Sequence, residues 1–215
     1  MKYLIIGAGG TGGCIGAYMT EAKKDVTMIA RGAHLQAMQE NGLQMETTKK
    51  GNYTICPVKA TDMEHYQEQP DIIFVCVKGY SLLGTIPFIR RVAKPETVVI
   101  PILNIYGTGG RLQEQLPELL VTDGCIYIAA EIKAPGCLWQ NGDIFRVVFG
   151  VRNPSEYRPV LEEVKKDLDE SGITGILSDD IRRDALMKFS YVSPAAACGQ
   201  YYDVMAGPMQ KPGEI

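Results

Sequence analysis

The stretch that decides the fold runs from Lys2 to Gly12 and reads KYLIIGAGGTG. It begins as a short apolar run and ends in the glycine-rich turn Gly7–Gly12, which has the spacing Gly-x-Gly-x-x-Gly. Residues 13–19 then continue as the opening of a helix. A buried strand, a glycine turn and a helix, in this order, form the arrangement that a dinucleotide-binding unit needs.

Each glycine of this turn has its own physical role in that interpretation. Gly7 permits the tight turn, Gly9 lets the backbone approach a pyrophosphate, and Gly12 lets the helix lie close to the strand. The helix N-terminus then presents free N–H groups and its positive dipole end to the phosphates. A turn that only serves packing accounts for Gly12 and Gly16 but not for the first two glycines. The expected cofactor-binding residues of the turn are Gly7, Ala8, Gly9, Gly10, Thr11 and Gly12.

The end of the second predicted strand, 25–30, bears on which nicotinamide cofactor is bound. A site for NAD(H) usually has Asp or Glu at the carboxyl end of this strand, where it accepts hydrogen bonds from the ribose 2′-OH. Here Asp25 lies at the opposite end, and Arg31 follows the strand. A guanidinium suits a 2′-phosphate, although a solvated surface arginine is the plainer alternative. The sequence therefore favours NADP(H) over NAD(H).

Composition and charge fit a soluble intracellular enzyme. The chain has 215 residues, of which 46% are hydrophobic, and this suits one large domain or one and a half. The net charge of −3, with no dense basic run, argues against nucleic acid as a partner. The first apolar run is too short for a transmembrane helix and lacks the cleavage pattern of a signal peptide. We therefore expect a cytoplasmic protein without membrane association.

The cysteines and histidines argue against two kinds of site. The two histidines, His34 and His65, lie in polar stretches and are expected to be exposed, so we expect neither a metal site nor a Ser-His-Asp triad. The cysteines are scattered without a Cys-x-x-Cys pair, and we interpret them as reduced core thiols. They are Cys14, Cys56, Cys76, Cys125, Cys137 and Cys198.

Beyond the second strand, the chain alternates predicted strands with predicted helices. The continuous apolar runs 71–77 and 97–103 are typical of strands buried on both faces of a parallel sheet, and a helix over 81–92, interrupted by Pro87, connects them. The predicted fold class is α/β, a Rossmann-like doubly wound sheet with an antiparallel hairpin added late. The remaining predicted elements are a helix at 33–41, a hairpin with arms 43–47 and 53–58, a strand at 121–129, a hairpin at 138–147 around Asn141-Gly142, a helix at 158–170 and a strand at 174–177.

Polar side chains follow both buried strands at the sheet edge where such folds bind ligands. Lys78 follows the first run and Asn104 follows the second, so both are candidate site residues, although turn asparagines and solvated lysines are common there. Further on, Ser178 is the predicted N-cap of a helix that contains Lys188. Asp184 lies four residues before this lysine, a spacing that by itself indicates an ordinary exposed ion pair.

Taken together, these segments resemble the ketopantoate reductases, also called 2-dehydropantoate 2-reductases, along nearly the whole chain. The resemblance implies that Arg31 binds the 2′-phosphate of NADPH and that Lys78 and Asn104 line the cofactor and substrate cleft. It also implies that Lys188 is the catalytic residue, which reverses the interpretation as an exposed ion pair. The segments that carry the resemblance are Gly7–Gly12, RGAHL at 31–35, VKGY at 77–80, LNIYG at 103–107, APG at 134–136 and LMKF at 186–189.

The implied reaction is the NADPH-dependent reduction of 2-dehydropantoate to pantoate, a step of pantothenate and coenzyme A biosynthesis. The cofactor supplies the hydride, and the ammonium of Lys188 hydrogen-bonds the keto oxygen and protonates it as alkoxide character develops. An anionic keto acid also suits a cleft that gathers Lys78 and Lys188.

Two features depart from the family pattern. Substrate-contacting asparagines usually follow the catalytic lysine, but residues 189–195 read FSYVSPA, in which Ser190 or Ser193 would replace them. The family also continues into an all-helical second domain. We therefore expect an NADP-binding Rossmann domain at 1–178 and the truncated beginning of a helical substrate domain at 179–215, with a loop at 206–215.

Three hypotheses remain open at this point. The chain is a ketopantoate reductase, a related NADP-dependent reductase of another 2-keto acid, or a nucleotide-binding fragment without turnover. The missing asparagines favour the second hypothesis, and the incomplete helical domain favours the third. We also expect apolar surface around Tyr191, Val192 and 195–197, which favours self-association such as a homodimer.

Overall fold

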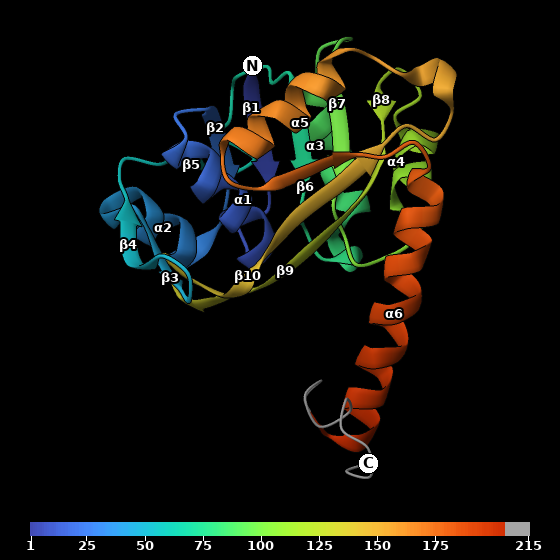
Figure 1. The fold of residues 1–215 in the computed structure, drawn as a ribbon. Coiled ribbons are helices and arrows are strands. Elements are labelled where there is room, and N and C mark those ends of the chain that lie inside the picture. Colours follow the sequence, from blue (N-terminus) through green and yellow to red (C-terminus); the bar gives the residue numbers. More distant parts are fainter. Residues whose placement is uncertain (205–215) are drawn as a thin grey trace.

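A computed structural model of the chain describes residues 1–204, and its centre is a six-stranded parallel sheet (Figure 1). The strand order is β5-β2-β1-β6-β7-β8, so β1 lies in the middle and the chain leaves it in opposite directions toward β2 and β6. This reversal of direction creates the switch point at which doubly wound folds bind ligands. The strands are β1 (Lys2–Ile6), β2 (Asp25–Ile29), β5 (Lys59–Thr61), β6 (Ile72–Val75), β7 (Val98–Pro101) and β8 (Leu120–Val121).

Both faces of this sheet are buried, which explains the unbroken apolar runs. Tyr3 and Ile5 face a core that includes α1 and α5, while Leu4 and Ile6 face a second core under α3 and α4. Successive side chains of a strand point to opposite faces, so β1 must be apolar throughout. The helices are α1 (Gly10–Glu21), α2 (Gly32–Asn41), α3 (Ile86–Val92), α4 (Thr108–Gln115), α5 (Val160–Glu170) and α6 (Ile181–Tyr202).

A second, mixed sheet covers the other side of α1. Its order is β11-β10-β3-β4. Strand β9 pairs antiparallel with β10, and the two strands form a long hairpin. All residues of α1 from Gly12 to Met19 are buried, because β9 and β10 pass over the helix (Figure 1). The strands are β3 (Leu43–Thr47), β4 (Gly51–Ile55), β9 (Asp123–Ala134), β10 (Cys137–Gly150) and β11 (Thr174–Leu177).

The α/β class and the late antiparallel hairpin are confirmed, but the turn predicted for that hairpin is wrong. Asn141-Gly142 lies inside β10, where the register with β9 shifts, and the reversal occurs at Pro135-Gly136. Both arms predicted around Asn141 pair with distant partners instead: Cys137–Gln140 lies beside β3, and Arg146–Gly150 lies beside β9. The strand predicted at 121–129 is also divided, because β8 pairs β7 in the first sheet and β9 belongs to the second.

Three further predictions are wrong, two on where helices begin and one on the cysteines. The helix expected over 81–92 starts only at Ile86, after two short 3-10 turns, and Pro87 lies in its first turn, where proline is tolerated. The N-cap of α6 is Asp180, not Ser178, because the Asp180 carboxylate accepts a hydrogen bond from the N–H of Arg183 at 3.1 Å. Two cysteines, Cys56 and Cys198, are exposed and so are not core thiols.

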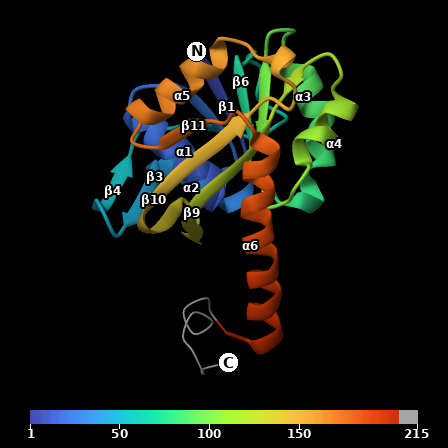
Figure 2. The same cartoon turned by 45° about the vertical axis from the view of Figure 1, so that its right-hand side comes forward.

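Helix α6 projects away from the two sheets, as Figures 1 and 2 both show. It continues past Pro194 to Tyr202 and exposes large apolar side chains, among them Met187 and Tyr191. Within residues 1–204, no helix combines the length and the apolar character needed to cross a bilayer. The loop predicted at 206–215 lies outside the described residues.

Candidate functional site

The turn between β1 and α1 has the form expected of a phosphate cradle. Gly7 has a φ of +103°, and the N–H groups of Gly7 and Ala8 both donate to the carbonyl of Ile29 at 3.2 and 3.0 Å. A Cβ added at Gly9 would meet no atom within 4 Å, so the space beside this residue is open. No side chain caps the start of α1, and the first N–H groups of a helix lack intrahelical partners. The turn therefore offers open space and free donors to a phosphate.

Two other glycines of the turn are explained by packing. A Cβ at Gly12 would lie 2.2 Å from the carbonyl oxygen of Gly7, so this glycine lets α1 approach β1. A Cβ at Gly10 would lie 2.5 Å from the carbonyl oxygen of Ala130, because β9 crosses the start of α1. The six residues from Gly7 to Gly12 thus surround the cradle, and their roles toward a cofactor stay predictions.

Arg31 lies near the end of β2 that is hydrogen-bonded to the glycine turn through Ile29. It follows the carboxyl end of β2 and is exposed, and its guanidinium has no hydrogen bond or ion pair to any residue from 1 to 204. The carboxyl end of β5 lies alongside, because the N–H of Ala30 donates to the carbonyl of Thr61 at 2.9 Å. Asp25, at the other end of β2, pairs with Lys59 at 2.6 Å. At the carboxyl end of β2 the charged side chain is therefore the cationic Arg31, and the anionic Asp25 lies at the amino end.

The tertiary structure brings two predicted site residues into direct contact. Nζ of Lys188, on α6, donates to Oδ1 of Asn104 at 2.7 Å, and Asn104 lies just beyond β7. The lysine is only 9% exposed, and burial lowers the pKa of its ammonium below the ordinary value, an effect that the nearby Cys125 opposes. The ion pair with Asp184 does not form in this structure, since Oδ2 of Asp184 accepts from the hydroxyl of Ser178 at 2.6 Å.

A small cleft surrounds this lysine. Nζ of Lys188 lies 5.4 Å from the centre of the Tyr127 ring, a cation–π distance. Tyr127 and Cys125 were not predicted as site residues, although two residues apart on one strand they share a face. The cleft is lined by Leu103, Asn104, Ile105, Gly124, Cys125, Ala185, Lys188, Phe189 and Val192.

The two other predicted substrate residues occupy different positions relative to this cleft. Lys78 is exposed beyond β6, and its loop meets the Asn104 loop, since a Cβ at Gly79 would lie 2.2 Å from the side chain of Ile105. Its ammonium has no partner within the described part of the chain. Ser193 is five residues beyond Lys188, so it points about 140° away around α6 and is not in the cleft lining. Its contact with substrate stays a prediction.

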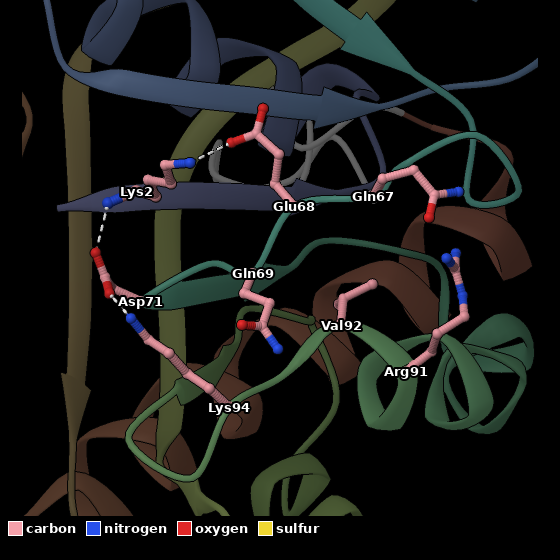
Figure 3. Close-up of a pocket in the computed structure, with 8 residues that line it drawn as sticks. All are labelled: Lys2, Gln67, Glu68, Gln69, Asp71, Arg91, Val92 and Lys94. Carbon is pink, nitrogen blue, oxygen red and sulfur yellow. Dashed lines mark hydrogen bonds and ion pairs between the residues drawn. The ribbon is translucent and has the colours of Figure 1, made fainter.

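A larger hollow lies at the opposite ends of the strands and is a poor candidate. Figure 3 shows it between the start of β1 and the segments beside Asp71 and Lys94. Most of its charges pair with one another: Lys2 pairs with Glu68 at 2.7 Å, and Lys94 pairs with Asp71. Doubly wound sheets bind ligands at the carboxyl ends of their strands, whereas this hollow is at the amino ends.

The prediction that His34 is exposed is wrong. This partly buried residue of α2 contacts the glycine turn through Ala8 and the β9–β10 turn through Gly136. Its polar sequence neighbours gave no sign of this, because both partners are distant in the chain.

Comparison with known proteins identifies the family. Residues 3–154 match the family described as ketopantoate reductase PanE/ApbA. The chain belongs to this family. The resemblance inferred from the sequence motifs is thus confirmed.

Relatives of this family member are similar over most of the chain but are longer. The chain is 28% identical over 213 residues to the uncharacterized oxidoreductase YkpB of Bacillus subtilis, covering 97% of this chain and 68% of the relative. It is 27% identical over 210 residues to the 2-dehydropantoate 2-reductase of Mesorhizobium japonicum, covering 87% of this chain and 63% of the relative. The chain thus spans about two thirds of the length of these proteins.

Solved structures confirm the fold. A crystal structure of 2-dehydropantoate 2-reductase from Porphyromonas gingivalis superposes with a TM-score of 0.88 at 30% identity, covering 100% of this chain and 76% of that one. A ternary structure of D-mandelate dehydrogenase with NADH and anilino(oxo)acetate has a TM-score of 0.86 at 21% identity, covering 100% and 69%. The second likeness concerns the fold alone.

Proposed function

We propose that this chain carries the cofactor-binding and proton-donating parts of an NADPH-dependent 2-keto acid reductase, with 2-dehydropantoate as the substrate. The observation that supports this most directly is the contact between Lys188 and Asn104 at the carboxyl ends of the parallel strands. It lies at the same sheet edge as the open glycine turn, and this is the edge at which doubly wound folds bind a dinucleotide.

The chemistry follows from the surroundings of the lysine. A reduced nicotinamide, when bound, supplies a hydride to the keto carbon. Oδ1 of Asn104 accepts a hydrogen bond from one of the three N–H groups of Lys188 and thereby orients the ammonium. The other two N–H groups are free to donate to the keto oxygen. Burial strengthens the hydrogen bond between the ammonium and the keto oxygen. Burial also lowers the pKa of Lys188, so the ammonium gives up its proton more readily. Lys188 is therefore suited to protonate the oxygen as negative charge develops there.

Two other cations define the ends of the proposed site. Lys78, with its ammonium unpaired among residues 1–204, is placed to attract the carboxylate of a keto acid. Arg31, at the end of β2, is placed to bind the 2′-phosphate of NADPH. In this proposal residues 1–178 form the nucleotide-binding domain, and α6 (Ile181–Tyr202) forms part of the other wall of the cleft.

A second candidate is a reductase of a different 2-keto acid. It is favoured by the sequence FSYVSPA at 189–195, which lacks the expected asparagines, and by the Tyr127 ring beside Lys188. An aromatic ring at this position narrows the space for a branched aliphatic acid and offers a surface to a flat one. A nucleotide-binding fragment without turnover is the third candidate.

Steady-state assays with NADPH separate the candidates. The 215-residue chain and the Porphyromonas gingivalis protein are each assayed with 2-dehydropantoate and with a series of aliphatic and aromatic 2-keto acids. Turnover of 2-dehydropantoate by both supports the main proposal, and we expect the shorter chain to be the slower. Turnover only of another acid supports the second candidate. Cofactor binding without turnover of any acid supports the third.

Self-association is proposed on separate grounds. Leu186, Met187 and Tyr191, all on α6, are 49%, 59% and 65% exposed. Large exposed apolar side chains of this kind favour association in water. Sedimentation velocity should show a dimer or larger species that dissociates in Tyr191→Lys, and a monomer at all concentrations would contradict this.

A further inference from the structure

His34 makes two hydrogen bonds to segments that are far apart in the sequence. Its Nε2 lies 2.9 Å from the carbonyl oxygen of Ala8, in the glycine turn. Its Nδ1 lies 3.0 Å from the backbone N of Gly136, in the turn between β9 and β10. The imidazole, in the first turn of α2, thus connects the candidate phosphate cradle to the second sheet.

These two partners determine which nitrogen carries the proton. A backbone N–H can only donate, so Nδ1 must accept from Gly136, and a carbonyl can only accept, so Nε2 must donate to Ala8. Both bonds exist together only in the neutral imidazole with its proton on Nε2. His34 is therefore a bridge with a defined direction, from the Gly136 amide through the ring to the Ala8 carbonyl.

The bond to Ala8 controls the direction of the next amide. The peptide between Ala8 and Gly9 is planar and trans, so its C=O and N–H groups point in opposite directions. Holding the Ala8 carbonyl toward His34 therefore turns the Gly9 N–H away from α2. That N–H has no protein partner within residues 1–204, and the space beside Gly9 is open. The other side of Ala8 is held too, because its N–H donates to Ile29 at 3.0 Å.

The second sheet is closely packed where His34 meets it. A Cβ at Gly136 would lie 2.8 Å from the Cβ of Ala37, one turn after His34 on α2, so the hairpin turn lies directly against this helix. The carbonyl of Gly136 also accepts from the N–H of Gln44 at 2.8 Å. His34 is thus held by a closely packed and hydrogen-bonded part of the fold while it contacts the glycine turn.

We propose that His34 is a positioning residue of the cofactor site: it orients the Ala8–Gly9 peptide so that the Gly9 N–H points at a dinucleotide pyrophosphate. This inference rests on the proposed function, because it assumes that the turn binds the pyrophosphate of NADPH. In this proposal the hydrogen bond to Ala8 increases the affinity for the dinucleotide, and the hydrogen bond to Gly136 holds the imidazole ring in place.

Three substitutions separate the two bonds. His34→Gln places an amide N–H near the position of Nε2 and can keep the bond to Ala8. His34→Asn places an amide oxygen near Nδ1 and can keep only the bond to Gly136. His34→Phe retains a ring and removes both. Binding is measured by titration with 2′-phospho-ADP-ribose, which contains the pyrophosphate, and with 2′-AMP, which lacks it.

We expect His34→Asn and His34→Phe to weaken binding of 2′-phospho-ADP-ribose by roughly 2- to 10-fold, the effect of one net hydrogen bond. His34→Gln should retain most of the affinity, and binding of 2′-AMP should be the same in all forms.

Other outcomes would overturn the proposal, and they distinguish it from the proposed function. Unchanged affinity in His34→Asn and His34→Phe, with tight binding by the unmodified chain, would exclude the role of His34 alone. Equal losses in the Gln and Asn variants, matched by equal losses in melting temperature, would show that the ring only supports the fold. An unmodified chain that binds 2′-phospho-ADP-ribose no better than 2′-AMP would exclude the pyrophosphate site itself.

Discussion

The ammonium of Lys188 donates a 2.7 Å hydrogen bond to the side-chain oxygen of Asn104, across 84 residues of sequence. The two residues come from different parts of the fold, the projecting helix α6 and the loop after β7. The lysine is nearly buried, and this hydrogen-bond partner is uncharged. A buried ammonium without a carboxylate partner is unfavourable for folding, so this arrangement indicates a functional site.

Lys188→Met should therefore separate activity from stability. Loss of the proton donor should lower kcat by roughly 10²- to 10⁴-fold and leave NADPH affinity nearly unchanged. At neutral pH, removal of the buried charge should raise the free energy of unfolding by about 1 kcal/mol. Steady-state kinetics and chemical denaturation measure the two effects. Lys165→Met, at an exposed ion pair on α5, is the control and should change neither. A variant with unchanged kcat would exclude Lys188 as the donor.

The stability effect of Lys188 should depend on pH in a defined direction. Its folded pKa is lowered from the model-compound value of 10.5, so the unfolded chain binds more protons between the two values. The free energy of unfolding of the unmodified protein should thus rise with pH between these two pKa values. The amount by which Lys188→Met exceeds it in free energy of unfolding should shrink over the same range. Denaturation at several alkaline pH values tests the slope, and an advantage that grows with pH would contradict the assignment.

Asn104→Asp should change the pH profile of turnover. A carboxylate at 2.7 Å from Nζ favours the charged ammonium and should raise the pKa of Lys188. The fall in turnover at high pH should move upward correspondingly, while KM for an anionic keto acid should increase through repulsion. Asn104→Ser, which adds no charge, is the control. An alkaline limb that stays in place would show that Lys188 does not control it.

Arg31→Ala should reduce cofactor discrimination. The guanidinium has no partner among residues 1–204, so its loss should not disturb the fold. NADPH binding should weaken by about 1.5–3 kcal/mol, the range for hydrogen bonds to charged groups, and NADH binding should barely change. Calorimetric titration measures both, and Arg182→Ala on α6 serves as a control. Equal affinity of the unmodified chain for NADH and NADPH would contradict the NADP(H) proposal.

Two glycines of the same turn should respond in opposite ways. Gly9→Val places a side chain in the open space beside Gly9, so it should abolish NADPH binding while the melting temperature stays nearly unchanged. Gly12→Ala places a Cβ 2.2 Å from the Gly7 carbonyl, so it should lower the melting temperature. Calorimetry and thermal melts on both variants test this pair. Normal NADPH binding by Gly9→Val would exclude the turn as the cofactor site.

Several features could be predicted because they depend on neighbours in sequence. The strand, glycine turn and helix at the N-terminus, the helix ending at Gly42 and the strand Thr174–Leu177 match their predicted positions closely. Periodicity, glycine with positive φ and apolar runs are local signals, and they are reliable where local structure is not altered by distant partners.

The incorrect predictions concern residues whose partners are remote. Asn141-Gly142 is a strong local turn signal, but β3 and β9 provide continuous pairing on both sides of it, and the strand passes through. Asp184 has the spacing of an ion-pair partner, but the hydroxyl of Ser178 binds it instead. In both cases tertiary contacts outweigh a weak local preference.

The class of this protein follows from local patterns: apolar runs alternating with helices indicate a doubly wound sheet, and the glycine spacing indicates a close backbone approach at its edge. How the site is assembled depends on tertiary contacts. Lys188 with Asn104, and His34 with Ala8 and Gly136, meet only after two sheets have packed on α1. Burial then lowers the pKa of Lys188, and the two hydrogen-bond partners of His34 select its tautomer. Such effects depend on distances between remote residues, which no local pattern encodes.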